Sequence, residues 1–81
     1  MMNSEVTKII QNQFSVKDRD LVIKELETIS LVHVMAQSDE NLKNTHVSIL
    51  KLAKGSVREV VRLVECAKSD FRDVIYWASL E

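Results

Sequence analysis

The sequence predicts an all-α fold, a compact bundle of four or five short helices, and three observations support this. The 81 residues include no proline and one glycine, so few positions break helices or form hairpin turns. Hydrophobic residues make up 46 % and charged residues 28 % of the chain, as in globular rather than disordered proteins. Apolar residues recur with a helical period between polar punctuation. We expect a single helical domain over residues 1–81.

The N-terminal part should form a short helix followed by a longer helical segment. A helix over about residues 4–13 is predicted by a stripe that consists of Val6, Ile9, Ile10 and Gln13. We expect residues 1–13 to fray, as chain termini often do. Ser15-Val16-Lys17-Asp18 has the pattern of a capping box, with aspartate in place of glutamate. The helix that follows either runs from about 16 to 37 or breaks near Thr28-Ile29-Ser30, with Ser30 capping a second piece.

A third helix is predicted from near Ser38, with acidic residues in its first turn, to a stop at Gly55. Its stripe consists of Leu42, His46, Ile49, Leu50 and Ala53. Ser56-Val57-Arg58-Glu59 is a full capping box and should open a fourth helix. The core face of that helix is predicted to contain Val57, Val60, Val61, Val64 and Ala67.

A fifth helix should begin with Ser69 as its N-cap and Asp70 in its first turn. Its apolar stripe consists of Phe71, Val74, Ile75 and Ala78. The final Leu80-Glu81 has the sequence that a common cloning site leaves, so we give residues 80–81 no functional weight.

The composition favours a cytoplasmic protein. Cys66 is the one cysteine, which excludes an internal disulfide and suits a reducing compartment. No apolar run approaches the roughly 20 residues that span a bilayer, and the N-terminus lacks the pattern of a secretory signal. We therefore expect no membrane partner.

Nothing in the sequence favours catalysis or a bound cofactor. The chain carries no phosphate-binding glycine loop, zinc-protease motif or nucleophile elbow. Asp70 and Asp73 fit a solvated helix start better than an acid–base pair. His33, His46 and Cys66 are potential zinc ligands, but their spacing is wide, and Cys66 is predicted to point away from the core. We expect no enzyme activity, no metal and no cofactor, and histidines with hydrogen-bond partners.

A basic cluster around Gly55 gives the alternative function, a nucleic-acid-binding regulator. The contacts would come from Lys51, Lys54, Arg58 and Arg62, on two helices joined by a short turn. The net charge of −1 argues against strong, non-specific binding. The spacing of small residues around Gly55 also fits a helix-turn-helix poorly. Nucleic acid is therefore the less favoured partner.

The aromatic residues near the C-terminus suggest a surface that contacts another protein or a second copy of this chain. Phe71 belongs to the predicted core face, but Tyr76 and Trp77 do not both fit that face. Trp77 should either cover the edge of the core, the favoured reading, or be offered to a partner. Tyr, Trp and Arg are enriched at binding hot spots. The predicted partner surface consists of Arg62, Cys66, Arg72, Tyr76 and Trp77.

The segment Ala67-Lys68-Ser69-Asp70-Phe71-Arg72-Asp73-Val74 resembles a pattern in small uncharacterised bacterial helical proteins. These proteins end in A-x-x-D-[F/Y]-R-D-V followed by a short apolar helix, and the likeness extends from about Leu50 to the end of the chain. The resemblance implies a helical fold and a bacterial origin. It implies no activity, cofactor or partner.

Overall fold

Four α-helices and a single 3₁₀ turn make up the part of the chain that the computed structural model describes, residues 3–33 and 38–81. No strand is present in these residues, so the predicted all-α bundle is confirmed. In chain order the elements are α1 (Ser4–Gln13), α2 (Val16–Glu27), η1 (Leu31–His33), α3 (Asp39–Ala53) and α4 (Val57–Ser79).

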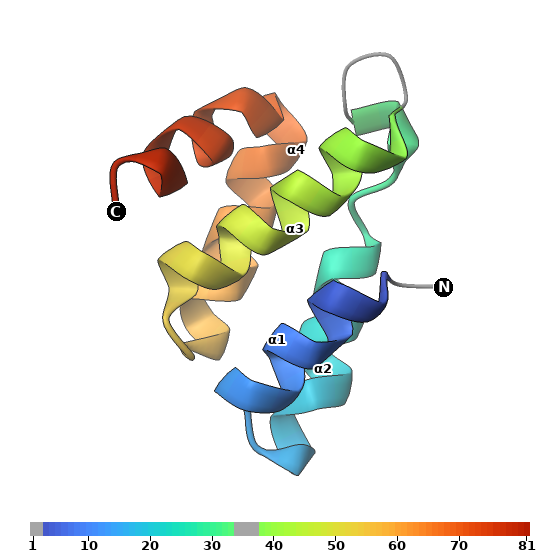
Figure 1. Ribbon diagram of the computed structural model, residues 1–81, viewed down its shortest axis with the longest axis vertical. Helices are drawn as coiled ribbons and strands as arrows, with labels where there is room; N and C mark the ends of the chain where they lie inside the picture. Colours follow the sequence, from blue (N-terminus) through green and yellow to red (C-terminus); the bar gives the residue numbers. More distant parts are fainter. Residues whose placement is uncertain (1–2, 34–37) are drawn as a thin grey trace.

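The core lies where all four helices meet. α3 and α4 share the most extensive contacts, and α1 and α2 pack against this pair (Figure 1). The segment expected to fray contributes two fully buried residues, Val6 and Ile10. Gln13 is exposed, and Phe14, just beyond the helix, is buried instead. The main core residues are Val6, Ile10, Phe14, Val22, Leu26, Ile29, Ile49, Leu50, Ala53, Val60, Leu63, Val64, Ala67, Phe71 and Val74.

The turn between α1 and α2 is held by Arg19 rather than by the predicted capping box. The Ser15 hydroxyl donates to the Asp18 carboxylate at 3.3 Å and caps no backbone N–H. Arg19 donates from Nε to the carbonyl oxygen of Phe14 at 3.1 Å and from a terminal nitrogen to that of Gln11 at 3.0 Å. These bonds satisfy carbonyl groups that the end of α1 leaves without helical partners.

The second helix breaks where the β-branched cluster occurs, which decides between the two sequence predictions. α2 ends at Glu27, and the Thr28 hydroxyl donates to the carbonyl oxygen of Glu25 at 2.6 Å. Ile29 then turns into the core, and the carbonyl oxygen of Ser30 accepts the backbone N–H of His33 at 3.0 Å. Ser30 therefore begins the 3₁₀ turn. Residues 34–37 of the predicted long helix lie outside the described residues.

The turn between α3 and α4 uses two consecutive residues with positive φ. α3 begins next to Ser38, as predicted, and Ser38 caps it by accepting the Asn41 N–H. At the other end Lys54 adopts the left-handed conformation, with φ 50°, and Gly55 follows with φ 85°. Ser56 then caps α4 by accepting the Glu59 N–H at 3.3 Å. The Glu59 carboxylate binds Arg62 instead of returning to Ser56, so the hydrogen bonds in the structure form half of the predicted capping box.

Replacing Gly55 with alanine should lower the free energy of unfolding by about 1–2 kcal/mol, because residues with a Cβ disfavour positive φ. The new Cβ would also lie 3.3 Å from the backbone oxygen of Gln13. Urea unfolding measures the loss. Lys54→Gly is the matched control, since it relieves the neighbouring left-handed residue and should not destabilise. Equal losses in both variants would contradict this account of the turn.

α4 bends at Asp70, and its two parts run in different directions (Figure 1). Asp70 has φ −158° and ψ 102°, non-helical values inside a helix of 23 residues. Its Oδ1 accepts the backbone N–H of Arg72 at 3.0 Å, which makes Asp70 the N-cap of the last part. The prediction that Ser69 caps a separate fifth helix was therefore wrong by one residue. We call residues 57–69 the first arm of α4 and residues 71–79 the second arm.

The buried face of the first arm differs from the predicted valine stripe. Val60 and Val64 are fully buried, but Val61 is 40 % exposed and Leu63 takes the place expected for it. The predicted face was therefore centred too close to Val61, and the observed face is centred closer to Leu63. Cys66, which was expected to point away from the core, is half-buried and packs against it.

Candidate interaction surface

The second arm buries one of its three aromatic residues and leaves the other two at the surface. Phe71 is 8 % exposed and belongs to the core, as predicted. Tyr76 is 62 % exposed, and Trp77, one residue further along the helix, is 38 % exposed. Since successive helical residues lie about 100° apart, the two rings leave the arm in different directions.

Trp77 lies beside an open hollow of about 350 Å³. The hollow is lined by Leu52 of α3, Arg62 and Leu63 of the first arm, and Trp77 of the second arm. We call this site the Trp77 hollow. Trp77 therefore forms part of the wall of a surface depression. Apolar side chains with a guanidinium at the rim suit an apolar or aromatic side chain of a partner.

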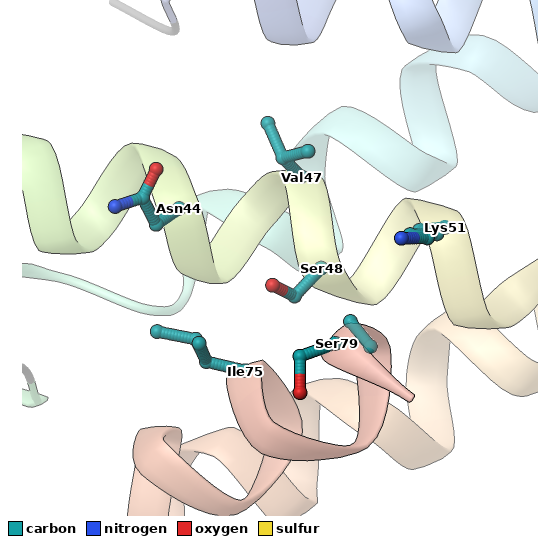
Figure 2. Close-up of a pocket in the computed structure, with 7 residues that line it drawn as sticks. Asn44, Val47, Ser48, Lys51, Ile75 and Ser79 are labelled. Atoms are coloured by element: carbon teal, nitrogen blue, oxygen red, sulfur yellow. The ribbon is translucent and has the colours of Figure 1, made fainter. Parts of the chain in front are cut away.

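A second open hollow, of about 270 Å³, lies along the other flank of the second arm. We call it the Ile75 hollow. Figure 2 shows Ile75 and Ser79 on the second arm beside α3, with Ser48 on the side of α3 that lies nearest to them. Its lining combines apolar groups with an amide, hydroxyls and an ammonium group: Asn44, Val47, Ser48, Lys51, Ile75, Ala78 and Ser79.

The structure brings together some members of the predicted partner surface. Arg62 and Trp77 line one hollow, while Cys66 is half-buried one turn after Arg62. Arg72 and Tyr76 lie one turn apart on the second arm, and both are exposed. Asp70 binds the Arg72 guanidinium through both carboxylate oxygens at 3.0 Å, and these hydrogen bonds lower the pKa of the Asp70 carboxyl.

The basic residues around Gly55 are partly neutralised by carboxylates. Lys54 lies 2.9 Å from the Glu81 carboxylate, and a terminal guanidinium nitrogen of Arg62 lies 2.7 Å from the Glu59 carboxylate. The hydrogen bond from Arg62 lowers the pKa of Glu59, so this carboxylate remains charged at neutral pH. Lys51 and Arg58 are exposed. The turn therefore presents less net positive charge than its sequence suggests.

Both histidines form hydrogen bonds with neighbouring backbone groups. His33 accepts the Ser30 N–H at Nδ1 over 3.0 Å, and His46 Nε2–H donates to the carbonyl oxygen of Leu26 at 3.0 Å. His46 is 5 % exposed, and burial lowers its pKa from the ordinary value of 6.5. Within residues 3–33 and 38–81, no three His, Cys, Asp or Glu side chains gather as metal ligands. The three candidate zinc ligands are therefore not assembled.

The two hollows themselves were not predicted from the sequence. Helical periodicity identified the second arm, but the hollows depend on the direction in which Asp70 sends that arm. The available signal was the aspartate two residues before Arg72, a pattern that places a capping oxygen close to a backbone N–H.

The chain matches no protein-family model, no curated protein and no solved structure. No described helix combines the length and the apolar character that crossing a bilayer requires.

Proposed function

We propose that this chain is a small, non-catalytic interaction or regulatory domain that binds a protein through the Trp77 hollow and the exposed face of the second arm. The observation that carries the proposal is the position of Trp77. The only tryptophan of the chain is 38 % exposed at the wall of an apolar depression instead of being enclosed in the core. Tryptophan beside an apolar depression is a common feature of interaction hot spots.

Charge and packing around the hollow support the same proposal. Arg62 supplies a rim charge that is paired with Glu59 on its own helix, so the side chain is held in place without being buried. Tyr76 is 62 % exposed on a neighbouring face of the second arm, next to but outside the hollow. A partner that places an apolar side chain in the hollow against Leu52 would bury Trp77 and leave the guanidinium at the edge of the interface.

Replacing Trp77 with alanine should abolish partner binding while costing only about 1–2 kcal/mol of stability, because the ring is partly exposed and a buried aromatic would cost about 3–5 kcal/mol. A photoreactive phenylalanine analogue at position 76 can test binding in the cells that produce the protein. We expect a discrete cross-linked protein that disappears when Trp77→Ala is added.

The matched control places the same analogue at Val16, an apolar residue that is 75 % exposed on α2. This position should give no such product. A Trp77→Ala variant that unfolds as readily as a core variant would show that the ring serves the core, and the interaction proposal would be withdrawn.

A nucleic-acid-binding role has less support. It would rely on Lys51, Lys54, Arg58 and Arg62, and Arg62 already forms an ion pair with Glu59 of its own helix. Affinity for nucleic acid depends strongly on the number of phosphates that free cations neutralise. The protein-binding proposal is therefore preferred.

A further inference from the structure

The second arm of α4 is joined to the first arm by a single non-helical residue. Asp70 is the one residue between 57 and 79 with non-helical φ and ψ, and helical geometry resumes at Phe71. Rotation of this one residue to helical values would turn the 23 residues into a continuous helix. Such a helix is about 34 Å long, close to the 33 Å longest dimension of the whole molecule.

The contacts at the bend are local. Asp70 accepts the backbone N–H of Arg72 and also binds the Arg72 guanidinium, so both groups come from a residue only two positions later. Both side chains are at least partly exposed, so this ion pair contributes little to stability. The bent form therefore depends mainly on the docking of the second arm.

The second arm docks through an apolar face but is open along both flanks. Phe71, Val74 and Ala78 are buried against the rest of the molecule. The Trp77 hollow lies along one flank and the Ile75 hollow along the other. At the far end, the Glu81 carboxylate reaches Lys54 after α3. An arm bordered by open hollows on both sides is less enclosed than a central core helix.

We propose that two copies of this chain exchange their second arms, with Asp70 as the hinge. A straightened α4 exposes both the apolar face of its own arm and the surface that the arm has left. The second arm of another copy has the same sequence, so it can make the same contacts on that surface. The exchange therefore reuses the contacts of the monomer and requires no additional complementary surface. Exchange of identical elements across a short hinge is a low-cost route to a dimer.

This inference goes beyond the proposed function, because the exchange uses the buried face of the second arm and not the Trp77 hollow. Asp70→Ala removes the capping oxygen and favours the straight helix, whereas Asp70→Asn keeps a good N-cap. We expect the dissociation constant of the Asp70→Ala dimer to be about tenfold lower, or more, than that of the Asp70→Asn dimer. Light scattering over a range of protein concentrations measures both.

The Lys54–Glu81 contact can report whether the second arm packs on its own chain or on the other copy, because Glu81 follows the second arm and Lys54 follows α3. A carbodiimide joins an amine directly to a carboxylate, and these two groups are 2.9 Å apart. When equal amounts of unlabelled and isotope-labelled Asp70→Ala chains are refolded together and coupled, exchange gives Lys54–Glu81 peptides that combine one labelled and one unlabelled half. Digestion and mass spectrometry detect them.

A folded Asp70→Ala chain that stays monomeric overturns the exchange, as does a dimer whose coupled peptides never mix the two isotopes. If Asp70→Ala does not fold, the wild-type chain refolded at high concentration gives the same test, and a dimer fraction with mixed peptides is expected. The two proposals can fail separately. If no exchange is found but the Trp77→Ala variant still loses the cross-linked protein, the proposed function stands and only the exchange is overturned.

Discussion

Replacing Phe71 with alanine is expected to lower the free energy of unfolding by about 3–5 kcal/mol, the largest loss that we expect for a single substitution in the second arm. Phe71 is the first residue after the bend, and its ring is 8 % exposed within the core cluster. Removing it leaves a cavity between the second arm and the body. Since single domains are stable by about 5–15 kcal/mol, this loss is a large part of the total stability.

Tyr76→Ala is the matched control, because it removes an aromatic ring of similar size from the same arm. Its ring is 62 % exposed, so we expect a change within about 0.5 kcal/mol. Urea unfolding followed by circular dichroism measures both variants. Similar losses in the two would mean that the second arm is not docked through Phe71.

Lowering the pH below about 6.5 should destabilise the protein through His46. Burial lowers the pKa of His46, with the hydrogen bond to the Leu26 carbonyl and the nearby Glu27 carboxylate acting in the opposite direction. The unfolded chain, where the pKa is near 6.5, then binds a proton that the folded chain does not. The free energy of unfolding is therefore highest above pH 6.5 and falls as the pH drops towards the folded pKa, by at most about 1.4 kcal/mol per pH unit.

The His46→Gln variant isolates this contribution. Glutamine has an N–H donor for the Leu26 carbonyl but no group that titrates in this range. The pH dependence of its unfolding between pH 7.5 and 5 (about the range above carboxylate titration) should be flatter than that of the wild type. His33→Gln serves as the control and leaves the His46 contribution in place. Parallel wild-type and His46→Gln curves would contradict the assignment.

Most of the helical architecture could be predicted because it depends on local signals. Ser38 and Ser56 accept backbone N–H groups at the starts of α3 and α4, as their sequence context indicates. Gly55 marks the turn because few other residues adopt positive φ without cost. These features are set within a few residues of chain, so one sequence is sufficient.

Features that depend on distant contacts could not be predicted in the same way. Val61 was predicted to be buried and Leu63 was overlooked, because a run of β-branched residues left the centre of the buried face ambiguous. Arg19 was overlooked because its partners are the carbonyl groups of another helix. The location of Trp77 followed from the direction of the second arm after Asp70: a local signal marks the bend, but the direction depends on the packing of the arm against the rest of the molecule. The candidate site was therefore predicted by residue type, while its shape came from the structure.

The position of Gly55 has a practical consequence for engineering the chain. A tight turn between two helices would ordinarily be a convenient place for an inserted peptide or for new termini. Here a Cβ added at Gly55 would lie 3.3 Å from the backbone oxygen of Gln13, so one side of the turn lies against the end of α1. Inserting residues at this turn would displace α1 as well as separate α3 from α4.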